Sequence, residues 1–286
     1  MSTEFRQRQV QCITTSGLHR MAYTEWGNPG NGKVLVCVHG LSRCSRDFDT
    51  LARAMADEYR VVCPDVPGRG LSGWLKDPME YQVQTYVADM VTLLARLDAD
   101  SLHWVGTSMG GLIGMTLASL PETPLQKLVL NDVGPVISAV SLARIGEYLG
   151  FAPQFPDFAT AVQYVRAVSA TFGAHSDAQW ATLTEHVTRT QSDGSYRMHY
   201  DPAIAVPFNA AKVEKDIELW PYYDAIRCPT LVIRGALSDL LKRETVEQMA
   251  ARGPRAKTVE IPEVGHAPTL MHAEQIAIVR EFLLEQ

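Results

Sequence analysis

The sequence has few cysteines, and it has no hydrophobic run long enough to cross a bilayer. Its five cysteines, in 286 residues, are odd in number, irregularly spaced and include no C-x-x-C pair, which is typical of free cysteines in a reducing compartment. Cys37 and Cys63 lie within strand-like runs and are expected to be buried as small hydrophobic side chains. No apolar run approaches the roughly 18 residues of a membrane span, and the first residues, MSTEFRQRQVQ, lack the apolar core of a signal peptide. We therefore expect a cytoplasmic protein that does not bind membranes.

Clusters of positive charge and of metal ligands are also lacking. The formal net charge is −6, and no Lys/Arg cluster of useful length occurs, which argues against a nucleic-acid partner. Six histidines show no metal-ligand spacing, and we expect no metal site and no cofactor: His19, His103, His175, His186, His199 and His272. A monomer and a homodimer are both compatible with the sequence.

Strand-like apolar runs and helical patterns alternate along most of the chain. After two strands at 10–15 and 19–26, strand-like runs occur at 33–38, 59–63, 102–105, 127–130, 230–234 and 258–261. Helical spacing occurs at 48–55, 81–97, 112–120, 244–251 and 273–284. This alternation predicts an α/β fold with a mostly parallel central sheet flanked by helices.

The alternation is interrupted once, after the sixth strand. From residue 136 to about 215 the pattern is helical but irregular, broken by prolines and glycines and rich in aromatic residues. We predict a helical cap, or lid, at 136–215, and a core domain formed by 1–135 and 216–286. Most of the aromatic side chains are expected to form the small core of the cap, and a few to face a pocket.

A G-x-S-x-G motif follows one of the predicted strands. Gly106-Thr107-Ser108-Met109-Gly110 stands directly after Leu102–Val105 and before a predicted helix. A serine at such a sharp strand-to-helix turn is exposed above the sheet, and only small residues fit on either side of it. The helix that follows directs its N-terminus at the site where negative charge would develop. Ser108 is therefore a candidate nucleophile.

A serine nucleophile needs a base and a carboxylate that orients the base. On a parallel sheet these groups lie on loops at the carboxyl ends of strands. Asp239 follows the strand at 230–234 and His266 follows the strand at 258–261, so we assign Asp239 as the acid and His266 as the base. Asp132, at the end of the strand after the nucleophile helix, is the alternative acid, although a turn or hinge role is favoured for it.

Acyl transfer also needs two N–H donors for the developing oxyanion. The backbone N–H of Met109 follows the nucleophile, and Leu41 lies in the loop His39-Gly40-Leu41-Ser42 after the strand at 33–38. We assign these two N–H groups to an oxyanion hole, with the Ser42 hydroxyl as a further donor. His39 is expected to be a structural residue, hydrogen-bonded within the loop.

With these motifs the whole chain resembles a capped α/β hydrolase of the small serine esterase type. The segment Asp65-Val66-Pro67-Gly68-Arg69-Gly70-Leu71-Ser72 resembles the D-x-x-G-x-G-x-S loop of that family, and 270–284 resembles its final helix. The loop at His39 departs from the HGGG form of some lipases, which makes an interfacial lipase a poorer fit. A serine at position 108 excludes the related dehalogenases and epoxide hydrolases, which use aspartate there.

The resemblance implies hydrolysis of a small carboxylic ester, including a lactone or a short hydroxyacid oligoester, through an acyl-enzyme. Three alternatives stay open: a C–C bond hydrolase of vinylogous diketones, a cofactor-free haloperoxidase or perhydrolase, and a non-catalytic ligand receptor. Arg43 and Arg46 follow the predicted oxyanion loop. One of them could bind a free acid group of the substrate, whereas two solvated arginines at a helix start is the simpler interpretation.

Overall fold

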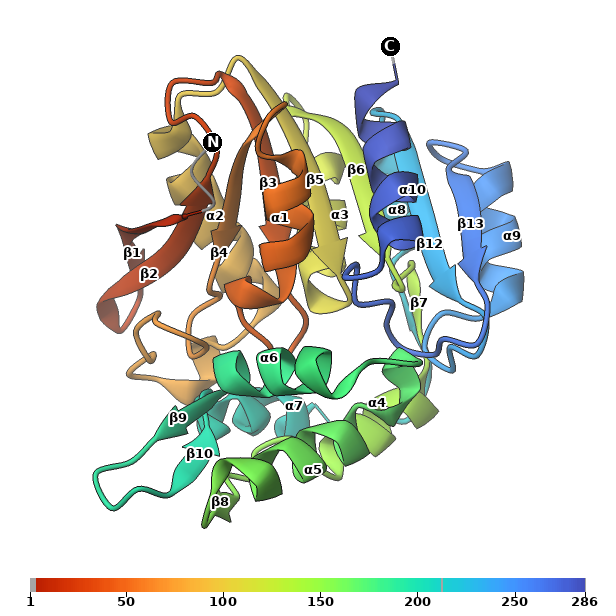
Figure 1. The fold of residues 1–286 in the computed structure, drawn as a ribbon. Coiled ribbons are helices and arrows are strands. Elements are labelled where there is room, and N and C mark those ends of the chain that lie inside the picture. Colours follow the sequence, from red (N-terminus) through yellow and green to blue (C-terminus); the bar gives the residue numbers. More distant parts are fainter. Residues whose placement is uncertain (1–3, 212, 286) are drawn as a thin grey trace.

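The fold is built on one eight-stranded sheet. The computed structural model describes residues 4–211 and 213–285. The strand order is β1-β2-β4-β3-β5-β6-β12-β13 (Figure 1). The pairs β1–β2 and β2–β4 are antiparallel, and the other pairs are parallel. Its strands are β1 (Arg6–Thr14), β2 (Gly17–Trp26), β3 (Lys33–Val38), β4 (Arg60–Pro64), β5 (Ser101–Thr107), β6 (Leu125–Asn131), β12 (Thr230–Gly235) and β13 (Lys257–Ile261). The predicted, mostly parallel α/β architecture is confirmed.

Helices cover both faces of this sheet because its central strands are apolar on both faces. Side chains of β3 alternate between two buried clusters, with Val36 in one and Leu35 in the other. The cluster around Leu35 includes side chains of α1 (Asp49–Met55) and α10 (Ala273–Leu284). The cluster around Val36 includes side chains of α2 (Val83–Leu97), α3 (Met109–Ser119), α8 (Trp220–Ala225) and α9 (Arg243–Ala251). Cys37 and Cys63 are fully buried, as expected.

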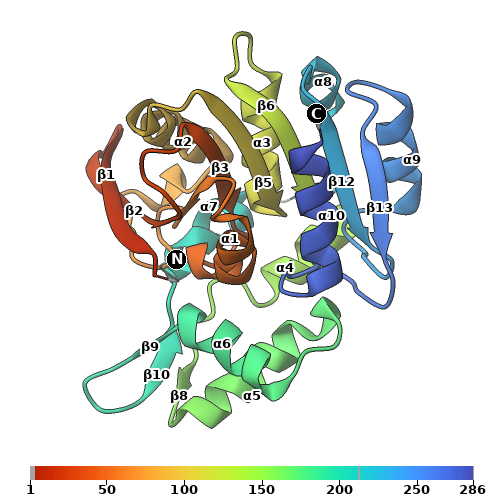
Figure 2. The ribbon, with the colours of Figure 1, turned by 45° about the horizontal axis from the view of Figure 1, so that its top comes forward.

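Segment 136–215, between β6 and β12, lies across the carboxyl ends of the parallel strands. In Figure 1 and Figure 2, α5 and α6 form a layer at that end of the sheet. The helices of this part are α4 (Ala139–Gly146), α5 (Phe158–Val168), α6 (Asp177–Val187) and α7 (Ala205–Ala210). The division into a core and a cap of 136–215 stays a prediction, but the elements of that segment do cover the strand ends.

Segment 136–215 contains short strands as well as helices, which the sequence interpretation did not predict. It contains a small antiparallel sheet of β8 (Gln154–Phe155), β10 (Tyr196–Met198) and β9 (Thr188–Thr190), and β7 (Val136–Ile137) pairs with β11 (Ile217–Glu218). Strands of two or three residues are too short to show an alternating pattern. In the described part of the chain, no helix is long and apolar enough to cross a membrane.

Candidate active site

The turn between β5 and α3 holds Ser108 in a strained backbone conformation. Ser108 has φ 52° and ψ −117°, a region that non-glycine residues seldom adopt. The neighbouring glycines permit this turn: a Cβ on Gly106 would lie 2.2 Å from the Gly110 carbonyl oxygen, and one on Gly110 would lie 2.0 Å from that of Val38. Both distances are far inside van der Waals contact, so the small residues of the motif are required by close backbone packing.

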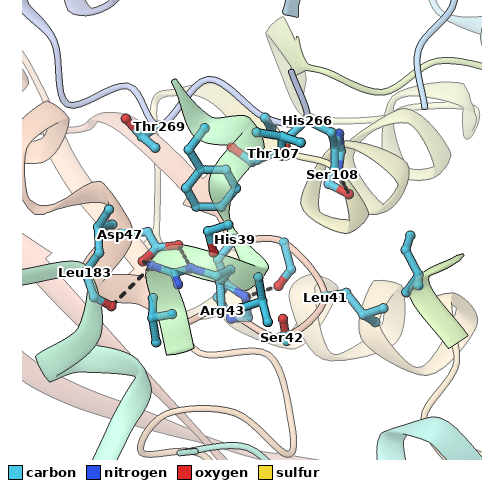
Figure 3. A pocket seen from close by; sticks show the side chains of 18 of the residues that line it. His39, Leu41, Ser42, Arg43, Asp47, Thr107, Ser108, Leu183, His266 and Thr269 are labelled. Carbon is cyan, nitrogen blue, oxygen red and sulfur yellow. Dashed lines mark hydrogen bonds and ion pairs between the residues drawn. The ribbon is translucent and has the colours of Figure 1, made fainter. Parts of the chain in front are cut away.

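Ser108 and His266 are joined by a hydrogen bond. The Ser108 Oγ lies 3.0 Å from His266 Nε2 (Figure 3). On the other side of the ring, His266 Nδ1 lies 2.7 Å from Asp132 Oδ2. The three side chains come from the ends of β5, β6 and β13, which meet at one edge of the sheet. A hydroxyl, an imidazole and a carboxylate are thus arranged in the order that serine activation requires.

The Asp132 carboxylate is fully buried, and nearby donors compensate its charge. It accepts hydrogen bonds from the Gly235 N–H at 2.8 Å and the Ser238 hydroxyl at 2.6 Å, in addition to the contact with His266. A buried carboxylate needs such partners to stay ionised. Gly235 is the last residue of β12 and Ser238 lies in the loop after it, where the sequence had suggested the acid itself.

The prediction that Asp239 would orient His266 is wrong. The Asp239 carboxylate is about half exposed and forms an ion pair with Arg144 Nη2, at 2.9 Å. Asp239 stands one residue beyond Ser238, and the chain there turns its carboxylate towards α4 instead of His266. The alternative, Asp132, occupies the position beside the imidazole.

Arg69, which the sequence reasoning did not single out, links the two residues assigned to an oxyanion hole. The fully buried Arg69 donates from Nε to the Leu41 carbonyl oxygen at 2.7 Å, and its Nη2 lies 3.8 Å from Met109 Sδ. Its Nη1 donates to the Tyr86 hydroxyl at 2.9 Å. Met109 begins α3, so its N–H has no acceptor within the helix. The assignment of the Leu41 and Met109 N–H groups stays a prediction.

His39 has the structural role that was expected. Its Nε2 accepts a hydrogen bond from the Val66 N–H at 2.9 Å, so Nδ1 donates to the Gly40 carbonyl oxygen at 2.7 Å. Burial lowers the pKa of His39 to about 4, so the ring is neutral at physiological pH. Both ring nitrogens are used, and His39 thereby ties the loop after β3 to the loop after β4.

A cavity opens over Ser108 and His266. Leu41, Ser42 and Arg43 line it from the loop after β3 (Figure 3). Its lining from segment 136–215 is largely apolar and includes Ile145, Tyr148, Val165, Val168, Phe172, Leu183 and Met198. Such a cavity fits a small, mostly apolar molecule with a few polar groups.

The two arginines predicted as substrate contacts lie in different surroundings. Arg43 lines the cavity, but its Nε and Nη2 both donate to the Asp47 carboxylate at 2.7 Å (Figure 3). Arg46 is paired with Asp49 and lies over the Phe5 ring, 4.2 Å from its centroid. The structure thus does not bring Arg46 into the lining of this cavity. Substrate contacts of Ser42 and Arg43 stay predictions.

One group of potential metal ligands lies in the interior, between the first hairpin and α2. Ligand atoms of Cys12, His19 and Asp89 all lie within 4.8 Å of one another. His19 Nε2 is 2.9 Å from Asp89 Oδ2, and burial, together with the charge of Asp89, raises the pKa of the Cys12 thiol to about 12. The expectation that the protein binds no metal stays a prediction.

Comparisons with known proteins agree with this fold. The family model of the alpha/beta hydrolase fold matches residues 33–273. The chain is 52% identical to a 3-hydroxybutyrate-oligomer hydrolase of Cupriavidus necator, over 99% of each chain. It is 24% identical to a pimeloyl-[acyl-carrier protein] methyl ester esterase of Pectobacterium atrosepticum, over 89% of this chain and 95% of the other. A solved alpha/beta hydrolase from Novosphingobium aromaticivorans matches with a TM-score of 0.88 and 34% identity, over 99% of each chain. The chain therefore belongs to the α/β hydrolase fold family.

Proposed function

We propose that this protein is a serine hydrolase that cleaves short oligoesters of hydroxyacids, with Ser108 as nucleophile, His266 as base and Asp132 as the acid. The single observation that carries the proposal is the continuous hydrogen-bonded chain from Ser108 Oγ through His266 to the buried Asp132 carboxylate. The name of the Cupriavidus necator relative supports the substrate class, and the small, apolar cavity above Ser108 is compatible with it.

In the first half-reaction, Ser108 Oγ attacks the ester carbonyl carbon and its proton passes to His266 Nε2. The tetrahedral intermediate carries an oxyanion, which the N–H groups of Leu41 and Met109 stabilise. The intermediate collapses when the C–O bond breaks, and His266 gives its proton to the departing alkoxide oxygen, which leaves as an alcohol. The products at this stage are a shortened alcohol and an acyl group on Ser108.

In the second half-reaction, water replaces the alcohol. His266 removes a proton from the water, which attacks the acyl carbonyl. The bond between the acyl carbon and Ser108 Oγ then breaks, His266 returns the proton to Ser108 Oγ, and the acid is released. Asp132 holds His266 in the tautomer with the proton on Nδ1 and stabilises the imidazolium that forms twice in the cycle. Segment 136–215 acts as a cap that keeps bulk water away from these steps.

The test is the Ser108→Ala variant on the dimer and trimer of 3-hydroxybutyrate. We expect kcat to fall roughly 10³-fold or more while the melting temperature is retained, because the change removes one oxygen atom. Labelling of wild type by a fluorophosphonate, lost in the variant, separates a serine hydrolase from a ligand receptor. Turnover of the variant near the wild-type rate contradicts the proposal.

A further inference from the structure

Arg144 carries a donor that nothing in the described structure satisfies. It lies on α4 and lines the cavity that also contains Ser108 and His266. Its Nε atom is buried and has no hydrogen-bond partner in the described part of the chain. A buried donor left without a partner loses the hydrogen bonds that it would make with water, which is energetically costly. The site is therefore more stable when a ligand oxygen accepts from this nitrogen.

The neighbouring nitrogen of the same guanidinium is held by a weak partner. Arg144 Nη2 lies 3.0 Å from Asp239 Oδ1 and 2.9 Å from Oδ2, and the two side chains are 42% and 52% exposed. An ion pair that is this exposed to water contributes little to stability. Nη2 can therefore donate to a second carboxylate, beside Asp239 or in its place, at a small cost in free energy. The Asp239 loop still holds Arg144 near the cavity.

The edge of a guanidinium formed by Nε and Nη2 matches a carboxylate, which accepts two parallel hydrogen bonds. Arg43 has no such edge available, because Asp47 already occupies it. The Arg43–Asp47 pair is also largely buried, with side chains 12% and 20% exposed, so its charges compensate each other in the cavity wall. Among the arginines that line the cavity, Arg144 is the one with an unused Nε.

We propose that Arg144 binds the free carboxylate at the acid end of the substrate, and that Asp239 positions Arg144 for this contact. The inference rests on the proposed function and narrows it. The preferred substrates are anionic oligoesters with an unblocked carboxyl end, and neutral esters of the same size bind more weakly. The proposal also gives a role to Asp239, which the sequence analysis had assigned as the catalytic acid.

The experiment compares the 3-hydroxybutyrate dimer with its methyl ester, which differs only in the charge of the acid end. In wild type we expect kcat/KM to be higher for the acid, mainly through a lower KM. In Arg144→Met, kcat/KM for the acid falls roughly 10- to 100-fold and the ratio of acid to methyl ester approaches one. Arg144→Lys keeps the positive charge but lacks the paired Nε and Nη2 donors. We therefore expect it to restore only part of the ratio of kcat/KM between the acid and the methyl ester.

Arg46→Ala is the matched control, because Arg46 is also an arginine in an ion pair but does not line the cavity; both kcat/KM values stay at the wild-type level. An unchanged ratio in Arg144→Met overturns the role of Arg144, and methyl ester turnover that still depends on Ser108 then leaves the proposed function intact. If wild type hydrolyses neither compound, both proposals are overturned.

Discussion

Asp132 and Asp239 lie in different surroundings. The same substitution, aspartate to asparagine, is therefore expected to have a large effect on kcat at position 132 and a small one at position 239. In Asp132→Asn, an amide group faces donors from Gly235, Ser238 and His266, and the imidazole loses the partner that fixes its tautomer. We expect kcat on a neutral p-nitrophenyl ester to fall by about 10³ to 10⁴. The measurement is steady-state kinetics, with the melting temperature recorded beside it.

Asp239→Asn is the matched control for that substitution. Its carboxylate is half exposed and contacts Arg144, not His266, so kcat on the neutral ester stays within a few-fold of wild type. A larger loss of kcat in Asp239→Asn than in Asp132→Asn would return the role of the acid to Asp239.

At the scale of single residues, part of the site was predictable from the sequence. Ser108 and the glycines beside it form a local motif whose backbone requirements are contained in five residues. The acid is a different case, because β6 and β12 are neighbours in the sheet and an aspartate follows each of them. Which of the two carboxylates reaches His266 depends on the left-handed backbone at Asp132, with φ 53°, and on the Ser238 hydroxyl. Both are tertiary features that no local pattern contains.

At the scale of elements, Arg69 connects the loop after β4 to the loop after β3 and to α3. Arg69→Met removes the donor to the Leu41 carbonyl oxygen and the contact with Met109. We expect kcat to fall about 10- to 100-fold through a displaced oxyanion hole, with a smaller change in KM. Kinetics are measured well below the melting temperature of each variant.

Tyr86→Phe distinguishes positioning from general destabilisation. It removes another partner of Arg69 but leaves the contacts with Leu41 and Met109 in place. Its melting temperature falls because a buried hydrogen bond is lost, yet kcat is retained. A parallel loss of kcat in Tyr86→Phe and Arg69→Met would show that Arg69 acts only through stability.

The helices and strands were predictable from the sequence where their hydrophobic pattern continues over several residues. The helix at 273–284 and the buried strand at 33–38 have the expected bounds, because their hydrophobic patterns extend over several residues. The short strands β8, β9 and β10 were not, since contacts with the rest of segment 136–215 stabilise them. For the same reason the role that we propose for Arg144, on α4 of that segment, could not be inferred without the fold.

At the scale of the whole molecule, two buried histidines predict that stability falls in mild acid. Burial lowers the pKa of His39 and that of His103 to about 4 each, against about 6.5 in an unfolded chain. Between these values the unfolded chain binds more protons, so the free energy of unfolding is fully retained above about pH 7 and decreases as the pH falls towards 4. Each histidine accounts for about 2 kcal/mol between pH 7 and pH 5.

The measurement is urea unfolding at pH 7.5, 6 and 5, for wild type and for His103→Asn. His103 is chosen because its ring contacts the Tyr59 hydroxyl, with 2.8 Å between Nδ1 and the oxygen, and does not line the cavity. The variant should be less stable than wild type at pH 7.5 but lose less stability on acidification. Equal pH slopes for the two proteins would be inconsistent with a neutral, buried His103.

The loop after β12 has a consequence for building chimeric enzymes. Ser238 supports Asp132, whereas the backbone carbonyl of Asp239 accepts a hydrogen bond from Ser141 and its carboxylate pairs with Arg144. Neighbouring residues thus serve the reaction centre and the segment that covers it. Transplanting 136–215 from a homologue without 235–241 would leave α4 without its anchor, and transplanting the loop alone would remove support from Asp132. The two segments form one unit of exchange, and recombination libraries should place their crossover points outside both.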